Sequence, residues 1–270
     1  MRYQLRRFLP ALLLAAACLY TYRLDVAKTH TYPAAGISGL NASTKNGFIR
    51  VTASTDTVLV VVESTYAYGR NLADAEQYIA NVIYSDTVVG NELRVKAEDT
   101  LGGSRPYGAS FTITAPDTID LALSTTNGEI SVTSTVGSIN ANTTNAGIEL
   151  IGTRGTASVS TTNGKLDVAV HSGALYGATT NGAIDCDIAV LDVAEDVGLA
   201  TTNGKVTLLL PADVSAVVEV TNSTGMITIH DFTVTYETQT EHHVRARIGS
   251  GASDITITTT NADVVVRRRS

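Results

Sequence analysis

Apolar residues recur with a period of nine through the middle of the chain. A glycine-rich column stands at positions 128, 137, 146, 155, 164, 173 and 182; apolar residues follow two and four positions later, with a mostly polar position between them. The first apolar column consists of Ile130, Ile139, Ile148, Ala157, Leu166, Leu175 and Ile184. Because alternate side chains of a strand point to opposite faces, this pattern predicts one short strand and one glycine corner per unit.

Two such units form a coil, marked by copies of Thr-Thr-Asn-Gly. The copies place their corner residues at Asn127, Gly128, Asn145, Asn163, Gly164, Asn181, Gly182, Asn203 and Gly204. A single unit cannot bury its apolar face, whereas stacked coils supply both a core and backbone hydrogen bonds. The sequence therefore predicts an all-β fold: a β-solenoid over residues 119–266, with about 18 residues and two short strands per coil.

The corners are expected to stack as ladders. Asn and Gly suit a corner because both tolerate positive φ. Thr126, Thr144, Thr162 and Thr180 of successive coils are expected to lie about 4.8 Å apart, with the Asn residues stacked likewise. Extra residues within 187–197 predict a bulge from one corner, after which the repeat resumes and closes at residues 259–266.

Residues 36–118 form a less regular N-terminal β region. It holds an early repeat copy at 43–51 and a buried-strand run at 58–62, with further strands predicted at 92–97 and 110–114. Between these strands, Asn71 can cap a helix over residues 71–84. The residues on one face of that helix are Leu72, Ala75, Ile79, Val82 and Ile83. We expect the helix to cover the N-terminal end of the stack, because exposed strand edges promote aggregation.

The N-terminus has the pattern of a bacterial export signal over residues 1–18. Basic residues precede an apolar run from Phe8 to Ala17, and small residues follow. The sequence Ala15-Ala16-Ala17-Cys18 resembles a lipobox, although Ala15 stands where Leu is usual, and Cys18 is then the lipidation site. Ordinary cleavage near Ala17 and an uncleaved signal anchor are the alternatives. Residues 19–35 are predicted to be a mobile tether.

Composition narrows the classes of partner. The net charge of −7 and the pI near 5.2 argue against a nucleic-acid partner, which requires a basic face. The basic run Arg267–Arg269 is short and is interpreted as a solvated strand end. Cys186 is the only cysteine besides Cys18, so a structural disulfide is not expected. No cofactor motif is found, and we expect no cofactor.

Histidines and acidic residues are the candidates for catalysis or metal binding. Surface roles are expected for His30, His171, His230, His242 and His243, with His171 exposed at a corner. The stretch 185–196 contains five acids, Asp185, Asp187, Asp192, Glu195 and Asp196. Such a cluster could serve glycoside hydrolysis or bind calcium. The interleaved apolar residues favour a solvated loop or strand edge instead. The repeats also lack the aspartate that calcium β-rolls carry in every coil.

Three features together resemble a known family. They are Phe111-Thr112-Ile113-Thr114-Ala115-Pro116, the Thr-Thr-Asn-Gly copies, and residues 204–212, which read Gly-Lys-Val-Thr-Leu-Leu-Leu-Pro-Ala. In this order, over residues 36–266, they resemble the bacterial putative adhesin domain family, envelope domains of unknown function. The resemblance implies an envelope β-solenoid without an agreed activity.

The leading hypothesis is an exported, non-enzymatic module of the cell envelope, structural or adhesin-like. It would be tethered to the membrane by an N-terminal lipid or signal anchor, and its partner would be a glycan, another envelope protein or a neighbouring copy. The competing hypotheses are a polysaccharide-active or calcium-binding protein that uses residues 185–196, and a protein that senses envelope conditions. Ice binding by the threonine array is a further alternative.

Overall fold

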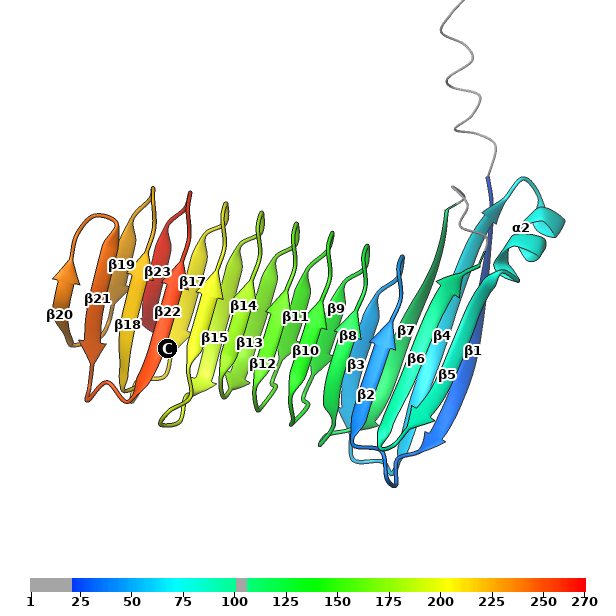
Figure 1. Cartoon of the computed structure of the whole chain (residues 1–270), viewed down its shortest axis with the longest axis horizontal. Coiled ribbons are helices and arrows are strands. Elements are labelled where there is room, and N and C mark those ends of the chain that lie inside the picture. The colour runs from blue at the N-terminus through cyan, green and yellow to red at the C-terminus, as the bar shows by residue number, and fades with distance from the viewer. Residues whose placement is uncertain (1–20, 101–105) are drawn as a thin grey trace, which may run out of the picture.

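The computed structural model describes residues 21–100 and 106–270. Two long β-sheets face each other along the molecule, and a short helix lies at one end (Figure 1). In spatial order, sheet 1 contains β1 (Tyr22–Pro33), β4 (Val58–Gly69), β7 (Tyr107–Pro116), β3 (Ile49–Ser54), β9 (Ile130–Thr133), β11 (Ile148–Ile151), β13 (Leu166–Ser172), β15 (Ile184–Val190), β17 (Val206–Leu210), β23 (Val264–Arg268) and β19 (Ile227–His230). Sheet 2 contains β20 (Val234–Gln239), β21 (His243–Ile248), β18 (Ala216–Thr221), β22 (Ser253–Thr258), β16 (Val197–Ala200), β14 (Leu175–Ala178), β12 (Ala157–Ser160), β10 (Ile139–Asn142), β8 (Asp120–Ser124), β2 (Gly39–Ser43), β6 (Glu92–Asp99) and β5 (Val82–Val89).

The central strands stack in parallel with whole coils in register. Ile130 pairs with Ile148, Ile148 with Leu166, and Leu166 with Ile184. The side chains of the two apolar columns point between the sheets and are buried. Each coil therefore completes the core of its neighbour, and the predicted β-solenoid is confirmed.

The parallel stack also reaches beyond residue 119 toward the N-terminus. β2 pairs in parallel with β8, and β3 pairs in parallel with β9. The early repeat copy at 43–51 is therefore the first coil of the same solenoid in the sequence, with no break at the expected boundary. In space, β6 and β7 stack in parallel on its other side.

The last coil in the sequence is not the last coil in space. β22 lies between β16 and β18, and β23 lies between β17 and β19. The chain thus forms the terminal coil, β18 and β19, before the last one in the sequence. After the β20–β21 hairpin it returns, and β22 and β23 insert between that terminal coil and the coil of β16 and β17. The sequential order expected from the repeats is wrong here.

Antiparallel strands close both sheets at the N-terminal end of the stack and sheet 2 at the other end, where sheet 1 ends on the parallel strand β19. At the N-terminal end, β4 lies between β7 and β1 in sheet 1, and β5 pairs with β6 in sheet 2. At the other end, β21 lies between β18 and β20. The predicted mobile tether over 19–35 is corrected, because residues 22–33 form β1 and pair with β4 along their whole length.

The helix α2 (Leu72–Ile79) begins where expected but is shorter. The side chain of Asn71 accepts a hydrogen bond from the Asp74 amide at 2.9 Å, as an N-cap does. The helix ends at Ile79 because the following residues pair with β6 as strand β5. Its buried residues are Ala75 and Tyr78, whereas Leu72 is exposed. The predicted range 71–84 and its apolar face are therefore partly wrong.

The predicted export signal and Cys18 lie outside the described residues. Within the described ranges, no helix is long and apolar enough to cross a membrane.

Candidate functional site

A ladder of asparagine amides runs along one edge of the solenoid. Each Asn lies in the turn that leads from sheet 2 to sheet 1, which we call the amide corner of its coil. In spatial order the ladder contains Asn46, Asn127, Asn145, Asn163, Asn181, Asn203 and Asn261. Each Nδ2 donates to the Oδ1 of the preceding coil at 2.6–2.8 Å. The amides thus hold successive coils in register.

A second ladder is formed by the first threonine of each corner. The buried members are Thr125, Thr143, Thr161, Thr179, Thr201 and Thr259. The hydroxyl of Thr179, for example, donates to the carbonyl oxygen of Gly164 in the preceding coil at 2.9 Å. The threonines expected to stack, such as Thr126 and Thr144, also lie in successive coils, where the Thr144 amide donates to the Thr126 carbonyl oxygen at 3.3 Å. Their side chains are half-buried or exposed, so the buried hydroxyls belong to the first threonine of each corner.

Close backbone contact explains the glycines of the amide corner. A Cβ atom at Gly128 would lie 1.7 Å from the carbonyl oxygen of Gly47, and one at Gly182 would lie 1.8 Å from that of Gly164. None of the corner glycines Gly128, Gly164, Gly182 and Gly204 has positive φ, so the predicted reason is wrong. Positive φ occurs at the opposite corner, where Gly155 has φ 118°.

The opposite corner, at residues 134–137, 152–155 and 170–173, reverses the strand alternation. Ser134, Gly152 and Val170 have φ values of 61°, 60° and 59°. Each of these left-handed residues turns the next side chain inward, so Thr135, Thr153 and His171 are buried. The expectation of an exposed His171 is therefore wrong.

Val170→Gly is expected to stabilise the protein by about 1 kcal/mol, because a β-branched residue is strained at positive φ. Gly152 holds the equivalent position one coil away, and Val170 is 42% exposed, so little apolar burial is lost. Urea unfolding of the two proteins measures the difference. Val190→Gly is the matched control, since Val190 is also exposed but is absent from the positive-φ residues. Equal stabilisation by both changes would contradict the role of strain.

His171 is held by two hydrogen bonds inside the corner. Nδ1 lies 2.9 Å from the hydroxyl of Thr153, and Nε2 lies 3.3 Å from the carbonyl oxygen of Ala174. Because a carbonyl only accepts, Nε2 carries the proton and Nδ1 accepts from Thr153. Burial lowers the pKa of His171 below its ordinary value.

His171→Thr is expected to flatten the acid side of the stability profile. Below a pH of about 6.5, the unfolded chain binds a proton at His171 that the folded chain does not bind, so wild-type stability falls as pH falls. The decline has a limiting slope of about 1.4 kcal/mol per pH unit and ends below the folded-state pKa. Threonine fits because Thr135 and Thr153 occupy the same column. Urea unfolding from pH 7.5 to 5 tests this, and parallel profiles for the two proteins would contradict it.

The other histidines lie apart from His171. His242 contacts Asn222 at 3.1 Å, and His243 contacts Glu219 at 3.0 Å. His230 is exposed. His30 is half-buried, because its ring stacks on Tyr84 at 4.1 Å and faces the buried Glu63. Within the described ranges, no group of three or more His, Cys, Asp or Glu residues is placed to hold a metal ion.

The five acids of residues 185–196 do not converge. Asp185 pairs with Lys165 at 2.8 Å and Asp187 pairs with Arg269 at 2.8 Å, both on sheet 1. In the loop, Glu195 accepts a hydrogen bond from the Asp192 amide at 2.9 Å, and Asp196 accepts one from the Asp254 amide at 3.0 Å. These acids thus form ion pairs and hydrogen bonds that stabilise the loop and the strands next to it. Arg269, in the basic run interpreted as a solvated end, has a structural partner here.

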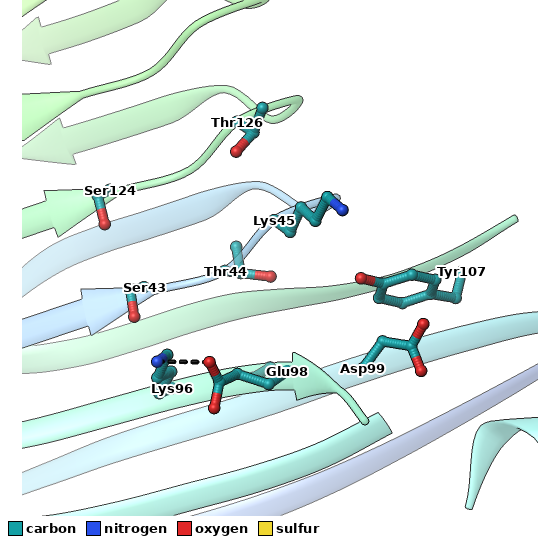
Figure 2. Close-up of a pocket in the computed structure, with 10 residues that line it drawn as sticks. Ser43, Thr44, Lys45, Lys96, Glu98, Asp99, Tyr107, Ser124 and Thr126 are labelled. Carbon is teal, nitrogen blue, oxygen red and sulfur yellow. Dashed lines mark ion pairs between the residues drawn. The ribbon is translucent and has the colours of Figure 1, made fainter. Parts of the chain in front are cut away.

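A cleft at the first coil brings together residues that are far apart in the sequence. It has a volume of about 510 Å³ and lies where the first amide corner meets the ends of β6 and β7 (Figure 2). Its lining residues are Ser43, Thr44, Lys45, Lys96, Ala97, Glu98, Asp99, Tyr107, Ser124 and Thr126. The lining therefore carries hydroxyls, two ammonium groups and two carboxylates.

Helix α2 and strand β6 position the aromatic side of this cleft. Tyr107 is 8% exposed, and its ring meets the ring of Tyr78 edge-on with a centroid distance of 6.4 Å. The Tyr78 hydroxyl donates to Asp99 at 3.3 Å. In Figure 2 the Tyr107 hydroxyl points toward Thr44 and Lys45, and Asp99 lies on the other side of the ring. Burial, together with the charge of Asp99, raises the pKa of Tyr107, so the hydroxyl remains a donor at neutral pH.

The cleft was not predicted from the sequence, although one signal for it is present. Lys45 stands in the column that holds Thr126, Thr144, Thr162, Thr180, Thr202 and Thr260 in the other coils. In the described part of the chain, Lys45 has no ion-pair partner, whereas Lys96 pairs with Glu98 at 2.5 Å. This departure from the threonine column thus places an ammonium group without an ion-pair partner among the described residues at the cleft.

Comparison with known proteins assigns the chain to a family. A family model described as Toastrack DUF4097 matches residues 109–267, more than half of the chain. The chain belongs to this family. The resemblance predicted from the repeat order is thereby confirmed. None of the curated proteins compared with this toastrack chain matches it.

Three of the solved structures that match this toastrack chain have low sequence identity to it. A putative cell adhesion protein from Clostridium sporogenes is 10% identical, with a TM-score of 0.40, covering 91% of this chain and 100% of its own. A putative adhesin from Bacteroides fragilis is 13% identical, with a TM-score of 0.39 and coverages of 90% and 97%. A putative lipid binding protein from Parabacteroides distasonis is 9% identical, with a TM-score of 0.36 and coverages of 90% and 97%.

The toastrack match contains most of the amide ladder but little of the cleft. It begins at Ala109 and so includes Ser124 and Thr126, whereas Thr44, Lys45 and Tyr107 precede it. The cleft is therefore built mainly by the part of this chain that lies outside the family match.

Proposed function

We propose that this toastrack chain is an exported, non-catalytic interaction module of the bacterial cell envelope, adhesin-like in role. The observation that carries the proposal is the continuous amide ladder from Asn46 to Asn261, which locks seven coils in register. The edge beside it repeats one set of exposed hydroxyl and amide groups. Such an edge offers many copies of one weak contact, and linked weak contacts raise avidity.

The position of β1 sets the geometry of a membrane tether. If Cys18 is lipidated, only residues 19–21 separate it from Tyr22, the first residue of β1. Three residues reach at most about 10 Å, so the N-terminal end of the rod would lie close to the membrane. Its partner, a glycan or another envelope protein, would then meet the edge of the rod as it extends away from the bilayer.

Mass spectrometry of the mature N-terminus from native membranes tests the tether. A diacyl or triacyl mass on Cys18 is the expected result, and Cys18→Ser should release the chain from the membrane fraction. An unmodified end near Ala17 or an intact Met1 would contradict lipid anchoring.

Cosedimentation of the full chain with isolated cell envelopes tests the interaction edge. Replacing Thr144, Thr162 and Thr180 by Glu is expected to abolish binding, because these exposed residues line that edge. Replacing the exposed Ser158, Thr235 and Thr256 by Glu adds the same charge within strands of sheet 2, away from the ladder, and should leave binding intact. Equal binding by both triple variants would contradict the assignment of the edge.

A further inference from the structure

We propose that the cleft between the first amide corner and strands β6 and β7 binds one acidic sugar unit of a glycan, with Lys45 and Tyr107 holding its carboxylate. The inference deepens the proposed function by naming the partner chemistry, and it rests on that function for its biological setting. Binding of the sugar can be measured on the purified folded chain, whatever its location in the cell.

The size and shape of the cleft suit a small ligand. Its volume of about 510 Å³ lies within the range of small-molecule sites. The groups that line it come from two successive amide corners, at residues 43–45 and 124–126, and from the ends of two strands. A ligand there would contact Lys45 and Thr126, which adjoin Asn46 and Asn127, the first two members of the amide ladder.

One side of the cleft can hold a carboxylate. Of the two ammonium groups that line the cleft, Lys45 is the one without an ion-pair partner in the described residues, and Figure 2 shows the Tyr107 hydroxyl pointing toward its side of the cleft. An ammonium and a phenolic O–H are both donors, and a carboxylate accepts from both. The Tyr78 ring, edge-on to Tyr107, fixes the direction of that hydroxyl.

The remaining lining favours a sugar acid over a phosphate. Asp99, and Glu98 in its ion pair with Lys96, bring carboxylates to the same cleft, which would oppose the larger charge of a phosphate group more than that of a single carboxylate. The same carboxylates accept hydrogen bonds from neutral hydroxyls, and Thr44 and Thr126 add groups that both donate and accept. A ligand with one carboxylate and several hydroxyls therefore matches the whole lining.

Titration calorimetry of the full chain with a tetrasaccharide of alternating glucuronic acid and N-acetylglucosamine tests the proposal. The matched probes are cellotetraose, which lacks the carboxylate, and inorganic phosphate, which lacks the sugar. The acidic tetrasaccharide should bind at least about tenfold more tightly than cellotetraose, the usual scale of one charged hydrogen bond. Phosphate should not compete with it. No binding of the acidic probe, or displacement by phosphate at equal concentration, would overturn the proposal.

Two variants and one control assign the site. Lys45→Thr restores the residue of every other aligned corner and should fold normally while losing about tenfold in affinity. Tyr107→Phe keeps the ring and removes the donor, with a loss in the same direction. Thr235→Lys places a lysine at an exposed position of β20, away from both the cleft and the ladder edge, and affinity should not change. Equal affinity of Lys45→Thr and wild type would show that the acidic probe binds elsewhere.

The outcomes separate this proposal from the envelope function. A chain that is tethered and binds envelopes through the ladder edge, but does not bind the acidic probe, would leave the envelope role standing and reject the cleft. A chain that binds the probe at Lys45 but is absent from the envelope would support the cleft site and reject the envelope role.

Discussion

Gly182→Val is expected to lower the free energy of unfolding by about 3 kcal/mol or more. A Cβ atom at this position would lie 1.8 Å from the carbonyl oxygen of Gly164 and 2.5 Å from its carbonyl carbon. Both contacts are with backbone, so relief requires the two coils to move apart. That movement would lengthen the amide bond between Asn181 and Asn163 and the hydroxyl bond of Thr179, now 2.8 and 2.9 Å. Urea unfolding followed by circular dichroism measures the loss.

Gly39→Val is the matched control for this substitution. A Cβ atom at Gly39 would have its nearest contact at 3.5 Å, with the flexible side chain of Glu92, and Gly39 is absent from the positive-φ residues. Its stability should change by less than about 1 kcal/mol. Gly182→Ala should fall between the two, because Ala146 and Ala262 occupy the same column in other coils. Similar losses from Gly39→Val and Gly182→Val would show that close backbone approach is not the reason for glycine here.

The strands were predictable because one interaction sets their pattern. Residues such as Ile148 and Leu150 alternate with polar ones, and burial between two sheets requires only that alternation. β1 carries a weaker form of the same signal, since the half-buried Leu24, Val26, His30 and Tyr32 are spaced by even numbers of residues. That signal was missed because β1 is an edge strand, with one neighbour and little burial.

The order of the coils at the C-terminal end could not be predicted from local patterns. β22 and β23 have the same alternation as any other coil, so their sequence fits any level of the stack. Their position in the stack is set by strand pairing at the C-terminal end. There β18 pairs with β21 on its outer side, which leaves its inner side for β22 of the last coil. A choice between equivalent levels depends on long-range pairing that periodicity does not encode.

The two kinds of corner differ in how well their buried side chains could be predicted. Leu121, Leu123 and Thr125 are all inward and evenly spaced, so the buried threonine could have been found by continuing the strand alternation into the turn. At the other corner the same rule fails, because the left-handed Val170 reverses the alternation before His171. Valine gives no sequence signal for positive φ. The cleft, in turn, depends on Lys45, Asp99 and Tyr107 meeting across the fold, and only Lys45 departs visibly from the repeat.

Thr179→Val is expected to cost about 2 kcal/mol, although it keeps the shape of the side chain. The Thr179 hydroxyl donates to the Gly164 carbonyl at 2.9 Å and accepts from the Gly182 amide at 3.2 Å. Valine removes both bonds and leaves a buried acceptor and a buried donor without that partner. The same change at the neighbouring Thr180, which is exposed, removes no buried hydrogen bond and should alter stability by less than about 0.5 kcal/mol.

The comparison of Thr179→Val with Thr180→Val decides which threonine ladder stabilises the solenoid. Both variants have the same composition and differ by one position in the same corner, so any difference comes from the direction of the side chain. Hydrogen exchange at the Gly182 amide should accelerate in the first variant alone, because that amide loses its acceptor. Equal stability losses, or faster exchange in the Thr180 variant, would return the stabilising role to the exposed ladder. The expected result makes the buried hydroxyls the fixed part of each corner and leaves the exposed ones open to contact a partner.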